Sequence, residues 1–378
     1  MKHILTGLLA ALLLSIPARA LDLSAPSAVL MEKETGTVLF EKDPHTALQP
    51  ASVTKIMTIL LTMEALDQGQ LQPDQLIAAS AHACSMGGSQ IWLKEREVMP
   101  VTDLLKAVCV VSANDCAVAL AEAISGSEEA FVDRMNQRAG ELGMADTHFV
   151  NATGLPAEGH LTSAHDIALM SRELILHHPQ IRDYTTIWMD TLRGGASSLV
   201  NTNKLIRFYD GATGLKTGST DGARYCLSAT AEREGMELIA VVLKAPTSKE
   251  RFDDARALLD HGFAAHSLAH PTLDPAPAPI PVTLGTVPFV EAKLGEGSAL
   301  LVEKGRAGHL TQTLELPETL TAPIEEGQTI GTLIVSDGEE VLARLPLLAD
   351  RAAAKRTYGQ QVLHLLHRTF GNFCKTFP

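Results

Sequence analysis

The order of hydrophobic patterns along the chain predicts an α+β fold. Short strand-like runs at 28–31 and 37–40 precede a series of helical patterns, and strand-like runs return at 225–231 and 238–243. Strands on both sides of a helical segment predict an antiparallel sheet assembled from both ends of one domain. A proline-rich stretch at 271–281 follows, and the short runs beyond it, cut by Gly and Pro, predict a small all-β domain.

Periodicity places each element. The first two runs enclose Glu-Lys-Glu-Thr-Gly, which predicts a β-hairpin. Apolar residues recur at three- and four-residue spacing from Ile56 to Leu66, which predicts a helix that ends near Gly69. Further helices are expected at 101–111, 116–124, 128–142, 163–177 and 251–263. Strands of the second domain are expected at 281–284, 299–302, 310–316, 329–335 and 340–345.

Charge and the N-terminus limit the partners and the compartment. The net charge of −13 over 378 residues, with no basic stripe, argues against a nucleic-acid partner. Lys2 and His3 lead into an apolar run that ends at Ala18-Arg19-Ala20, the pattern of a secretory signal peptide over 1–20. A membrane-spanning helix is the alternative, but about 12 apolar residues fall short of the roughly 20 required. The sequence therefore predicts an exported protein.

The cysteines and histidines indicate neither a disulfide framework nor a metal site. Five cysteines form an odd set without framework spacing. Cys109 and Cys116 flank Ser112, and a nucleophilic role is conceivable, but on an apolar helix they are better read as small buried hydrophobes. No Cys/His cluster has zinc spacing. We expect no metal and no cofactor.

The C-terminal segment predicts a basic amphipathic helix. Its apolar face would comprise Tyr358, Val362, Leu365, Leu366, Phe370, Phe373 and Phe377, and its positive charges are Lys355, Arg356, Arg368 and Lys375. In an acidic protein, such a helix is typical of an anchor that lies in the membrane interface. The alternative is an ordinary helix packed on the β domain.

The first of three short motifs is Ser-Val-Thr-Lys at 52–55. Ser52 follows Pro50-Ala51 at or near a helix N-terminus, where it could simply cap the helix. Lys55, three residues on, lies one turn along the same face, so its amine can reach the Ser52 hydroxyl. Apolar surroundings and a second cation at Lys216 would both favour a neutral amine. The hypothesis is that Lys55 takes the Ser52 proton.

The second motif is Ser-Ala-Asn at 112–114, which interrupts an apolar stretch where polar groups need partners. In a functional interpretation, Ser112 relays protons between Lys55, Lys216 and a leaving amine, and Asn114 binds a substrate amide. In the alternative, the motif caps the helix that resumes at Cys116. Both interpretations can hold together.

The third motif is Lys-Thr-Gly at 216–218, which we interpret as an edge strand entering a turn. Gly218 would let a ligand backbone approach, so that an extended peptide pairs with the strand. Lys216 and Thr217 would offer a positive charge and a hydroxyl to a carboxylate. A surface lysine in a turn is the alternative.

In this order, the three motifs resemble those of the low-molecular-mass penicillin-binding proteins, specifically the D-alanyl-D-alanine carboxypeptidases of the serine peptidase S11 type. The likeness extends to the segments at 86–90, 150–156, 201–203 and 249–251, and to the whole plan of the chain. It implies a β-lactamase/transpeptidase-like catalytic domain at 21–270, a β domain at 271–350 and an anchoring helix at 351–378.

The resemblance also implies roles for the site residues. Ser52 would be the acylated nucleophile and Lys55 its base, with Ser112 and Asn114 as helpers. Thr217 and Arg251 would hold the terminal carboxylate, and the backbone N–H groups of Ser52 and Ser219 would form the oxyanion hole. Ala113 stands where Gly is frequent, and Ser219 where several relatives carry His or Tyr. A backbone N–H donor survives either change, so the implied roles stand.

The substrate implied by the resemblance is a peptidoglycan stem peptide ending in D-Ala-D-Ala, with β-lactams as covalent inhibitors. The enzyme would work at the outer face of the cytoplasmic membrane. A serine β-lactamase is one alternative, but class A enzymes need a Glu-x-x-Leu-Asn string to activate the deacylating water, and none lies between Asn114 and Lys216. A non-catalytic penicillin sensor or wall-binding scaffold is another, and it would predict fused membrane-spanning helices.

Overall fold

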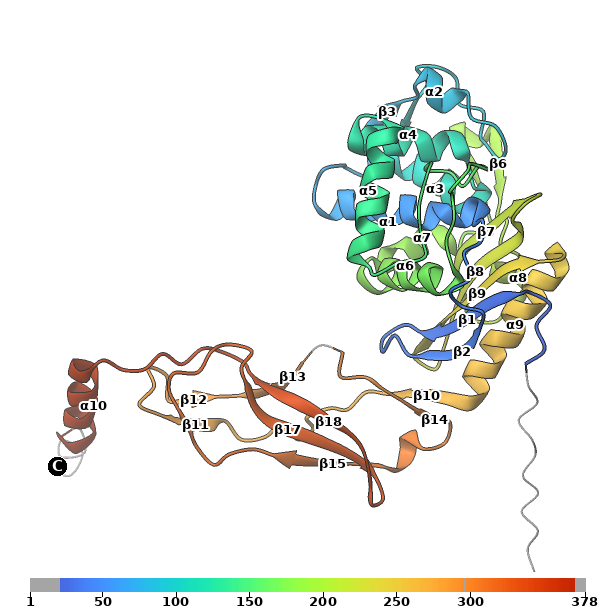
Figure 1. Cartoon of the computed structure of the whole chain (residues 1–378). Helices are drawn as coiled ribbons and strands as arrows, with labels where there is room; N and C mark the ends of the chain where they lie inside the picture. The colour runs from blue at the N-terminus through green and yellow to red at the C-terminus, as the bar shows by residue number, and fades with distance from the viewer. Residues whose placement is uncertain (1–20, 296, 371–378) are drawn as a thin grey trace, which may run out of the picture.

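The computed structural model describes residues 21–295 and 297–370, with side chains as far as Leu366. The predicted signal peptide at 1–20 and the tail residues Phe373, Lys375 and Phe377 lie outside the described residues. Figure 1 shows a mixed helix-and-strand body, an elongated β part that extends from it, and a helix at the far end. The predicted fold class, α+β followed by a small all-β domain, is confirmed.

A five-stranded antiparallel sheet forms the base of the larger body. Its strands, in the order β2-β1-β9-β8-β7, come from both ends of the domain, as predicted. They are β1 (Ser27–Glu32), β2 (Val38–Lys42), β7 (Ala212–Thr220), β8 (Arg224–Arg233) and β9 (Met236–Ala245). The Lys-Thr-Gly motif lies on β7, and β7 is an edge strand as expected.

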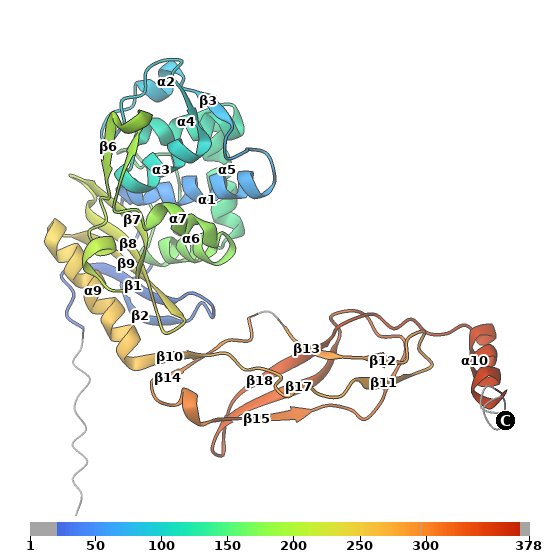
Figure 2. The same cartoon turned by 180° about the vertical axis from the view of Figure 1, so that it is seen from behind.

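Helices cover both faces of this sheet (Figures 1 and 2). One face packs against the larger group, α1 (Lys55–Asp67), α3 (Val101–Val111), α4 (Asn114–Ser125), α5 (Glu128–Glu141) and α6 (Ala164–His177). The other face packs against α9 (Ser248–Ala265). The central strand β9 is mostly apolar because alternate side chains enter both cores: Ile239 and Val241 face the helical group, and Leu238 and Ala240 face α9.

Several short elements have no counterpart in the periodicity analysis. They are η1 (Ala51–Thr54), α2 (Ala81–Cys84), η2 (Pro179–Ile181), α7 (Arg182–Thr185), η3 (Arg193–Gly195) and α8 (Leu205–Phe208), together with the hairpins β3 (Leu76–Ala78)–β4 (Val98–Pro100) and β5 (Met189–Leu192)–β6 (Ser197–Val200). Segments of three or four residues span about one period of a helix pattern, which is too short for an apolar spacing to recur.

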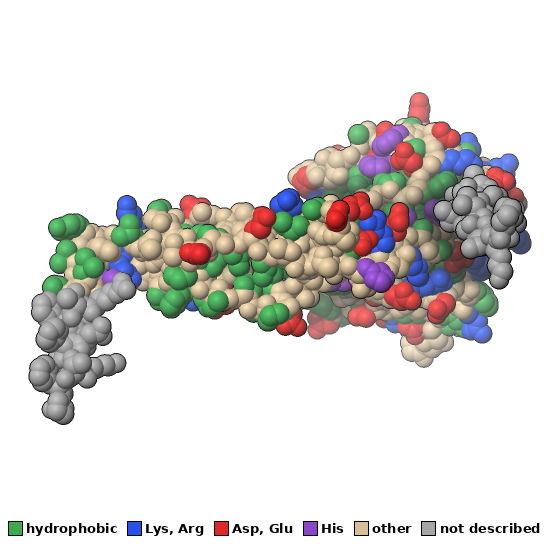
Figure 3. Space-filling view, turned by 90° about the horizontal axis from the view of Figure 1, so that it is seen from below, with side chains coloured by type: hydrophobic (Ala, Val, Ile, Leu, Met, Phe, Trp, Pro, Cys, Tyr) green, Lys and Arg blue, Asp and Glu red, His purple; other side chains and the backbone are tan. Residues whose placement is uncertain are grey.

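The β part contains two small sheets, in the orders β13-β18-β17-β15 and β12-β11-β16. Its elements are β11 (Ile280–Thr283), β12 (Phe289–Val290), β13 (Ala292–Leu294), β14 (Leu300–Glu303), η4 (Ala307–His309), β15 (Leu310–Glu315), β16 (Leu320–Thr321), β17 (Thr329–Asp337) and β18 (Glu340–Ala349). A two-stranded ribbon joins this part to the larger body, because β10 (His266–Ala269) pairs with β14. The face shown in Figure 3 carries many hydrophobic side chains.

The last described element is α10 (Tyr358–Phe370). Its apolar side chains are not buried against the β part: Val362 is 40% exposed, Leu363 59% and Leu366 48%. Pairing of the β part extends past the predicted boundary at 350, since Ala353 pairs with Ile324 and is fully buried. Among the residues that the structure describes, no helix has the length and apolar character needed to cross a membrane.

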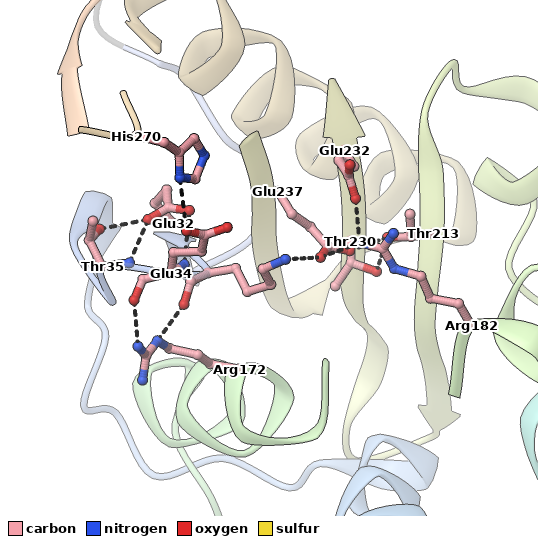
Figure 4. A network of polar contacts seen from close by, with 11 residues as sticks. Glu32, Glu34, Thr35, Arg172, Arg182, Thr213, Thr230, Glu232, Glu237 and His270 are labelled. Carbon is pink, nitrogen blue, oxygen red and sulfur yellow. Dashed lines mark hydrogen bonds and ion pairs between the residues drawn. The ribbon is translucent and has the colours of Figure 1, made fainter. Parts of the chain in front are cut away.

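A polar network ties the turn between β1 and β2 to the start of β7 (Figure 4). The fully buried carboxylate of Glu237 pairs with Arg182, lies 3.2 Å from the Lys33 amine, and accepts a 2.7 Å hydrogen bond from the Thr213 hydroxyl. Arg172 of α6 donates to the Lys33 carbonyl oxygen at 2.6 Å. Loss of one partner in a buried ion pair is strongly destabilising, so the network holds the beginning of β7 firmly against its neighbours.

Candidate active site

Ser52 and Lys55 lie at the junction between η1 and α1. Ser52 is in the 3-10 turn, and Lys55 is the first residue of α1. The Lys55 amine lies 3.0 Å from the Ser52 hydroxyl oxygen, which is the contact expected from their spacing. Ser52 is not a capping residue, because Pro50 and Thr54 hold the two N-cap positions and neither is joined by a side-chain cap.

Lys55 is a fully buried lysine without a carboxylate in contact among the described residues. Its amine donates to the Ser52 hydroxyl and, at 2.6 Å, to the backbone carbonyl of Thr153. Burial lowers the pKa of Lys55 well below its usual range, the positive charge of Lys216 lowers it further, and the negative charge of Asp115 opposes both. The geometry therefore favours a neutral amine beside the Ser52 hydroxyl.

The segment 150–160 supports this pair from behind. Asn151 accepts hydrogen bonds from the Thr153 and Gly154 backbone N–H groups, which fixes the carbonyl that holds Lys55. His160 is buried, and its ring bridges the Val150 N–H at 3.0 Å and the Thr54 hydroxyl at 2.8 Å. Burial, with smaller effects of His148 and Lys55, lowers the pKa of His160 to about 4, so the ring is neutral near pH 7.

The Ser112–Asn114 turn separates α3 from α4 and leaves two buried polar atoms without a hydrogen-bond partner among the described residues. Ser112 ends α3 in the left-handed region, with φ of 64°, and its hydroxyl has no hydrogen-bond partner. Asn114 donates from its amide to the Gly87 carbonyl at 2.6 Å, while its side-chain oxygen is unpartnered. Ser112 does not cap the next helix, since Ala113 occupies that position. Unpartnered buried acceptors cost about 1–3 kcal/mol each, so they mark a place where a ligand's polar groups fit.

Strand β7 brings the third motif against the first. Lys216 and Thr217 are buried; the Lys216 amine donates to the Thr217 carbonyl at 2.9 Å, and the Thr217 hydroxyl donates to Thr202 at 2.7 Å. A Cβ at Gly218 would lie 2.9 Å from the backbone nitrogen of Ser52. The close approach that we attributed to a ligand at this glycine is therefore made by the chain's own backbone, which brings β7 within van der Waals contact of η1.

Lys216 is a second buried cation near Lys55. Burial is the main cause that lowers its pKa, to about 7; the positive charge of Arg251 acts in the same direction, and Cys109 opposes both. Cys109 and Cys116 are buried, and loss of solvent raises the pKa of Cys109 to about 12. They are small buried residues, as expected, rather than nucleophiles.

The two remaining predicted residues are Ser219, near the C-terminal end of β7, and Arg251, on α9, which contacts the same end of that strand. Ser219 is exposed and pairs with Tyr225 of β8 in the sheet register. Arg251 of α9 is buried, and its guanidinium donates to the carbonyls of Gly218 at 3.1 Å and Cys226 at 3.3 Å, while its Nε has no partner in the part of the chain that the structure describes. The structure thus brings residues from all three motifs and α9 to one end of the sheet edge.

Periodicity and the three motifs assigned no role to three contributors, although Thr202 lies in the 201–203 segment to which the resemblance extends. Thr202 connects two of the motifs, because its backbone N–H donates to Val110 near Ser112 while its hydroxyl accepts from Thr217. His160 leaves no distinctive signal in the sequence. Asp115 could have been noticed, since an acid inside a long apolar stretch needs a partner when it is buried. Together these groups form an arrangement in which a lysine amine can act as the base for a serine hydroxyl.

Comparison with known proteins places this geometry in a family. A family model described as D-alanyl-D-alanine carboxypeptidase matches residues 15–247, and one described as the C-terminal domain of penicillin-binding protein 5 matches residues 275–355. The D-alanyl-D-alanine carboxypeptidase DacF of Bacillus subtilis is 42% identical over 334 residues, which cover 87% of this chain and 84% of DacF.

Solved structures of penicillin-binding proteins are similar to this chain in fold. Penicillin-binding protein 5 from Haemophilus influenzae has a TM-score of 0.74 at 29% identity, with 88% of this chain and 98% of that chain covered. The ampicillin-bound form of penicillin-binding protein D2 from Listeria monocytogenes has a TM-score of 0.59 at 35% identity, over 64% of this chain and 99% of that one.

The chain belongs to the D-alanyl-D-alanine carboxypeptidase family of serine peptidases. These matches confirm the family resemblance and the carboxypeptidase activity that were predicted from the sequence. The β-lactamase and penicillin-sensor alternatives are not favoured.

Substitution of Gly154 by alanine tests the support behind the nucleophile. Gly154 has φ of +80°, and a Cβ there would lie 1.9 Å from the carbonyl oxygen of Ala51, next to Ser52. We expect Gly154→Ala to lower the melting temperature and to slow acylation by a fluorescent penicillin at least about a hundredfold, because η1 must move. Gly159→Ala is the matched control, with φ of +78° but no atom nearer than 4.0 Å. Equal acylation rates in the two variants would contradict the prediction.

Proposed function

We propose that this chain removes the terminal D-alanine from peptidoglycan stem peptides that end in D-Ala-D-Ala, through an acyl-enzyme on Ser52. The observation that carries the proposal is the 3.0 Å contact between a fully buried Lys55 amine and the Ser52 hydroxyl. A desolvated lysine with a lowered pKa is a competent general base for a serine.

In the proposed acylation, neutral Lys55 takes the Ser52 proton as the Ser52 oxygen attacks the carbonyl of the penultimate residue. The backbone N–H groups of Ser52 and Ser219 stabilise the oxyanion, which the close packing of Gly218 on η1 supports. Ser112 passes the proton to the departing amine, so that free D-alanine leaves. Water then hydrolyses the ester and returns the Ser52 hydroxyl.

Substrate binding would use the edge of β7 and the unpartnered atoms around it. An extended peptide pairs with β7, while the free side-chain oxygen of Asn114 accepts a substrate amide N–H. Lys216, Thr217 and Arg251 supply the positive charge and the hydroxyl for the terminal carboxylate. Arg251 would act chiefly through its charge, because its guanidinium already donates to two backbone carbonyls.

The proposed roles of Ser52 and Lys55 are tested by covalent labelling. Ser52→Ala should lose all labelling by a fluorescent penicillin and all D-alanine release from a peptide ending in D-Ala-D-Ala, because the acylated atom is gone. Lys55→Ala should lose at least about a thousandfold in labelling rate, since no base remains. Both variants should keep the circular-dichroism spectrum of the parent. Rapid labelling of Lys55→Ala would refute the role of Lys55.

The two buried lysines predict a bell-shaped pH dependence. Activity should rise with pH as Lys55 loses its proton, and fall above about pH 7, where Lys216 loses the charge that attracts the terminal carboxylate. The measurement is kcat/KM for D-alanine release against pH. The control is the release of D-alaninamide from the same peptide with an amidated C-terminus, which should be slow and should lack the alkaline decline. An identical decline for both substrates would contradict the assignment to Lys216.

We further propose that the protein is exported and acts at the outer face of the cytoplasmic membrane, with α10 in the membrane interface. The pattern at 1–20 supports export, and the exposed apolar residues of α10 support an interfacial position. β-Lactams would be covalent inhibitors, by analogy with the ampicillin-bound relative.

Vesicle co-sedimentation tests the anchor. A chain that ends at Thr357 keeps the buried Ala353 and should no longer sediment with anionic phospholipid vesicles, whereas the longer mature chain should. The double variant Val362→Asp with Leu366→Asp should also fail to bind, because two charges enter the apolar face. His364→Asp, on the opposite face, is the matched control. Equal sedimentation of all forms would exclude the anchor.

A further inference from the structure

Asp115, next to Asn114, is a fully buried carboxylate held by backbone groups. It accepts hydrogen bonds from the N–H groups of Ile91 at 3.2 Å, Leu93 at 3.0 Å and Cys116 at 2.9 Å. Within the described ranges 21–295 and 297–370, no Lys, Arg or His forms an ion pair with it. Burial of an ionised carboxylate without an ion-pair partner is costly. The three backbone N–H donors offset part of this cost, and their position shows what the carboxylate does in the fold.

Two of the three donors, the N–H groups of Ile91 and Leu93, belong to the segment that also holds Asn114. The Gly87 carbonyl accepts from the Asn114 side chain, and the Ser89 carbonyl accepts from the Asn114 backbone N–H at 2.7 Å. Asn114 and Asp115 therefore form hydrogen bonds with one loop, 87–93, at successive points. Between the two N–H groups that Asp115 holds, Trp92 is kept at φ of 61° and is 73% exposed. A bulky residue stays in that region only where its surroundings enforce it.

Asp115 also acts on the base through its charge. The charge of Lys216 lowers the pKa of Lys55, and the charge of Asp115 raises it. Lys55 in turn lowers the pKa of His160. Around Asp115 itself lie Cys84, Cys116 and Arg193, and its negative charge raises the pKa of each. The anion thus partly offsets the cationic environment that Lys216 creates around Lys55.

We propose that Asp115 is a positioning residue for acylation: it clamps the 87–93 loop so that the free oxygen of Asn114 is fixed for the substrate. The negative charge of Asp115 acts on Lys55 in addition to this clamp. The proposal rests on the proposed function of that pair. A purely structural reading also exists, since Asp115 lies in the first turn of α4, where a carboxylate stabilises the helix dipole. The two readings differ in what they predict for the pH dependence of acylation.

The test uses Asp115→Asn, with Asp254→Asn as the matched control. Asp254 is also a buried carboxylate that accepts backbone N–H bonds, from Ser24 and Ala25, but it does not contribute to the charge around Lys55. The second-order rate of acylation by a fluorescent penicillin is measured across pH, together with thermal unfolding. For Asp115→Asn we expect at least about a tenfold lower plateau and an acid limb displaced to lower pH, because the charge that favours protonated Lys55 is gone. Asp254→Asn should lose stability only.

Asp115→Glu separates the two parts of the proposal, and it also covers the case in which Asp115→Asn does not fold. The longer carboxylate keeps the charge but cannot keep all three hydrogen bonds, so the plateau should fall while the acid limb stays in place. An unchanged plateau in Asp115→Glu, or an unmoved acid limb in a folded Asp115→Asn, would overturn the proposal. Labelling that survives in Ser52→Ala would instead overturn the proposed function, so the two failures are distinct.

Discussion

The complete burial of Lys55 is the constraint on which the rest of the site depends. A lysine removed from water without an acid partner must either lose its proton or be stabilised by dipoles, and here the Ser52 hydroxyl and the Thr153 carbonyl are the groups in contact with it. Both contacts need rigid support. Asn151 locks the turn that carries Thr153, and His160 connects that segment to Thr54, beside Lys55. Lys55 is thus part of the core, and its lowered pKa follows from its burial.

The second constraint is the contact between η1 and the edge of the sheet. Gly218 lets β7 approach the backbone of Ser52 without a side chain between them. The beginning of β7 is held by the hydrogen bond from Thr213 to Glu237, and its middle is held by the hydrogen bond from Thr217 to Thr202. An edge strand fixed at several points keeps its outer hydrogen-bonding groups in a constant position, which is what pairing with an extended peptide requires. Stability of the fold and geometry of the site therefore rest on the same contacts.

Much of the architecture could be predicted because long elements carry strong periodicity. The span 101–111 was predicted and observed with the same bounds, and the edge position of the Lys-Thr-Gly strand was correct. Several elements of three or four residues, such as α2 and α7, were missed, and the run at 299–302 pairs with β10 of the junction instead of with the β domain's own sheets. Pairing partners depend on the path of the whole chain, which local patterns do not contain.

The sequence by itself determined the residue types, the order of the motifs and the one local contact of the site, because three residues of helical backbone place Lys55 beside Ser52 whatever surrounds them. The tertiary structure alone decided how deeply each group is buried, that Gly218 contacts the chain's own backbone, and that Asp115 grips the loop that holds Asn114. Those properties arise from segments far apart in the chain, and desolvation, which sets the charge of the lysines, is a property of the whole packed fold.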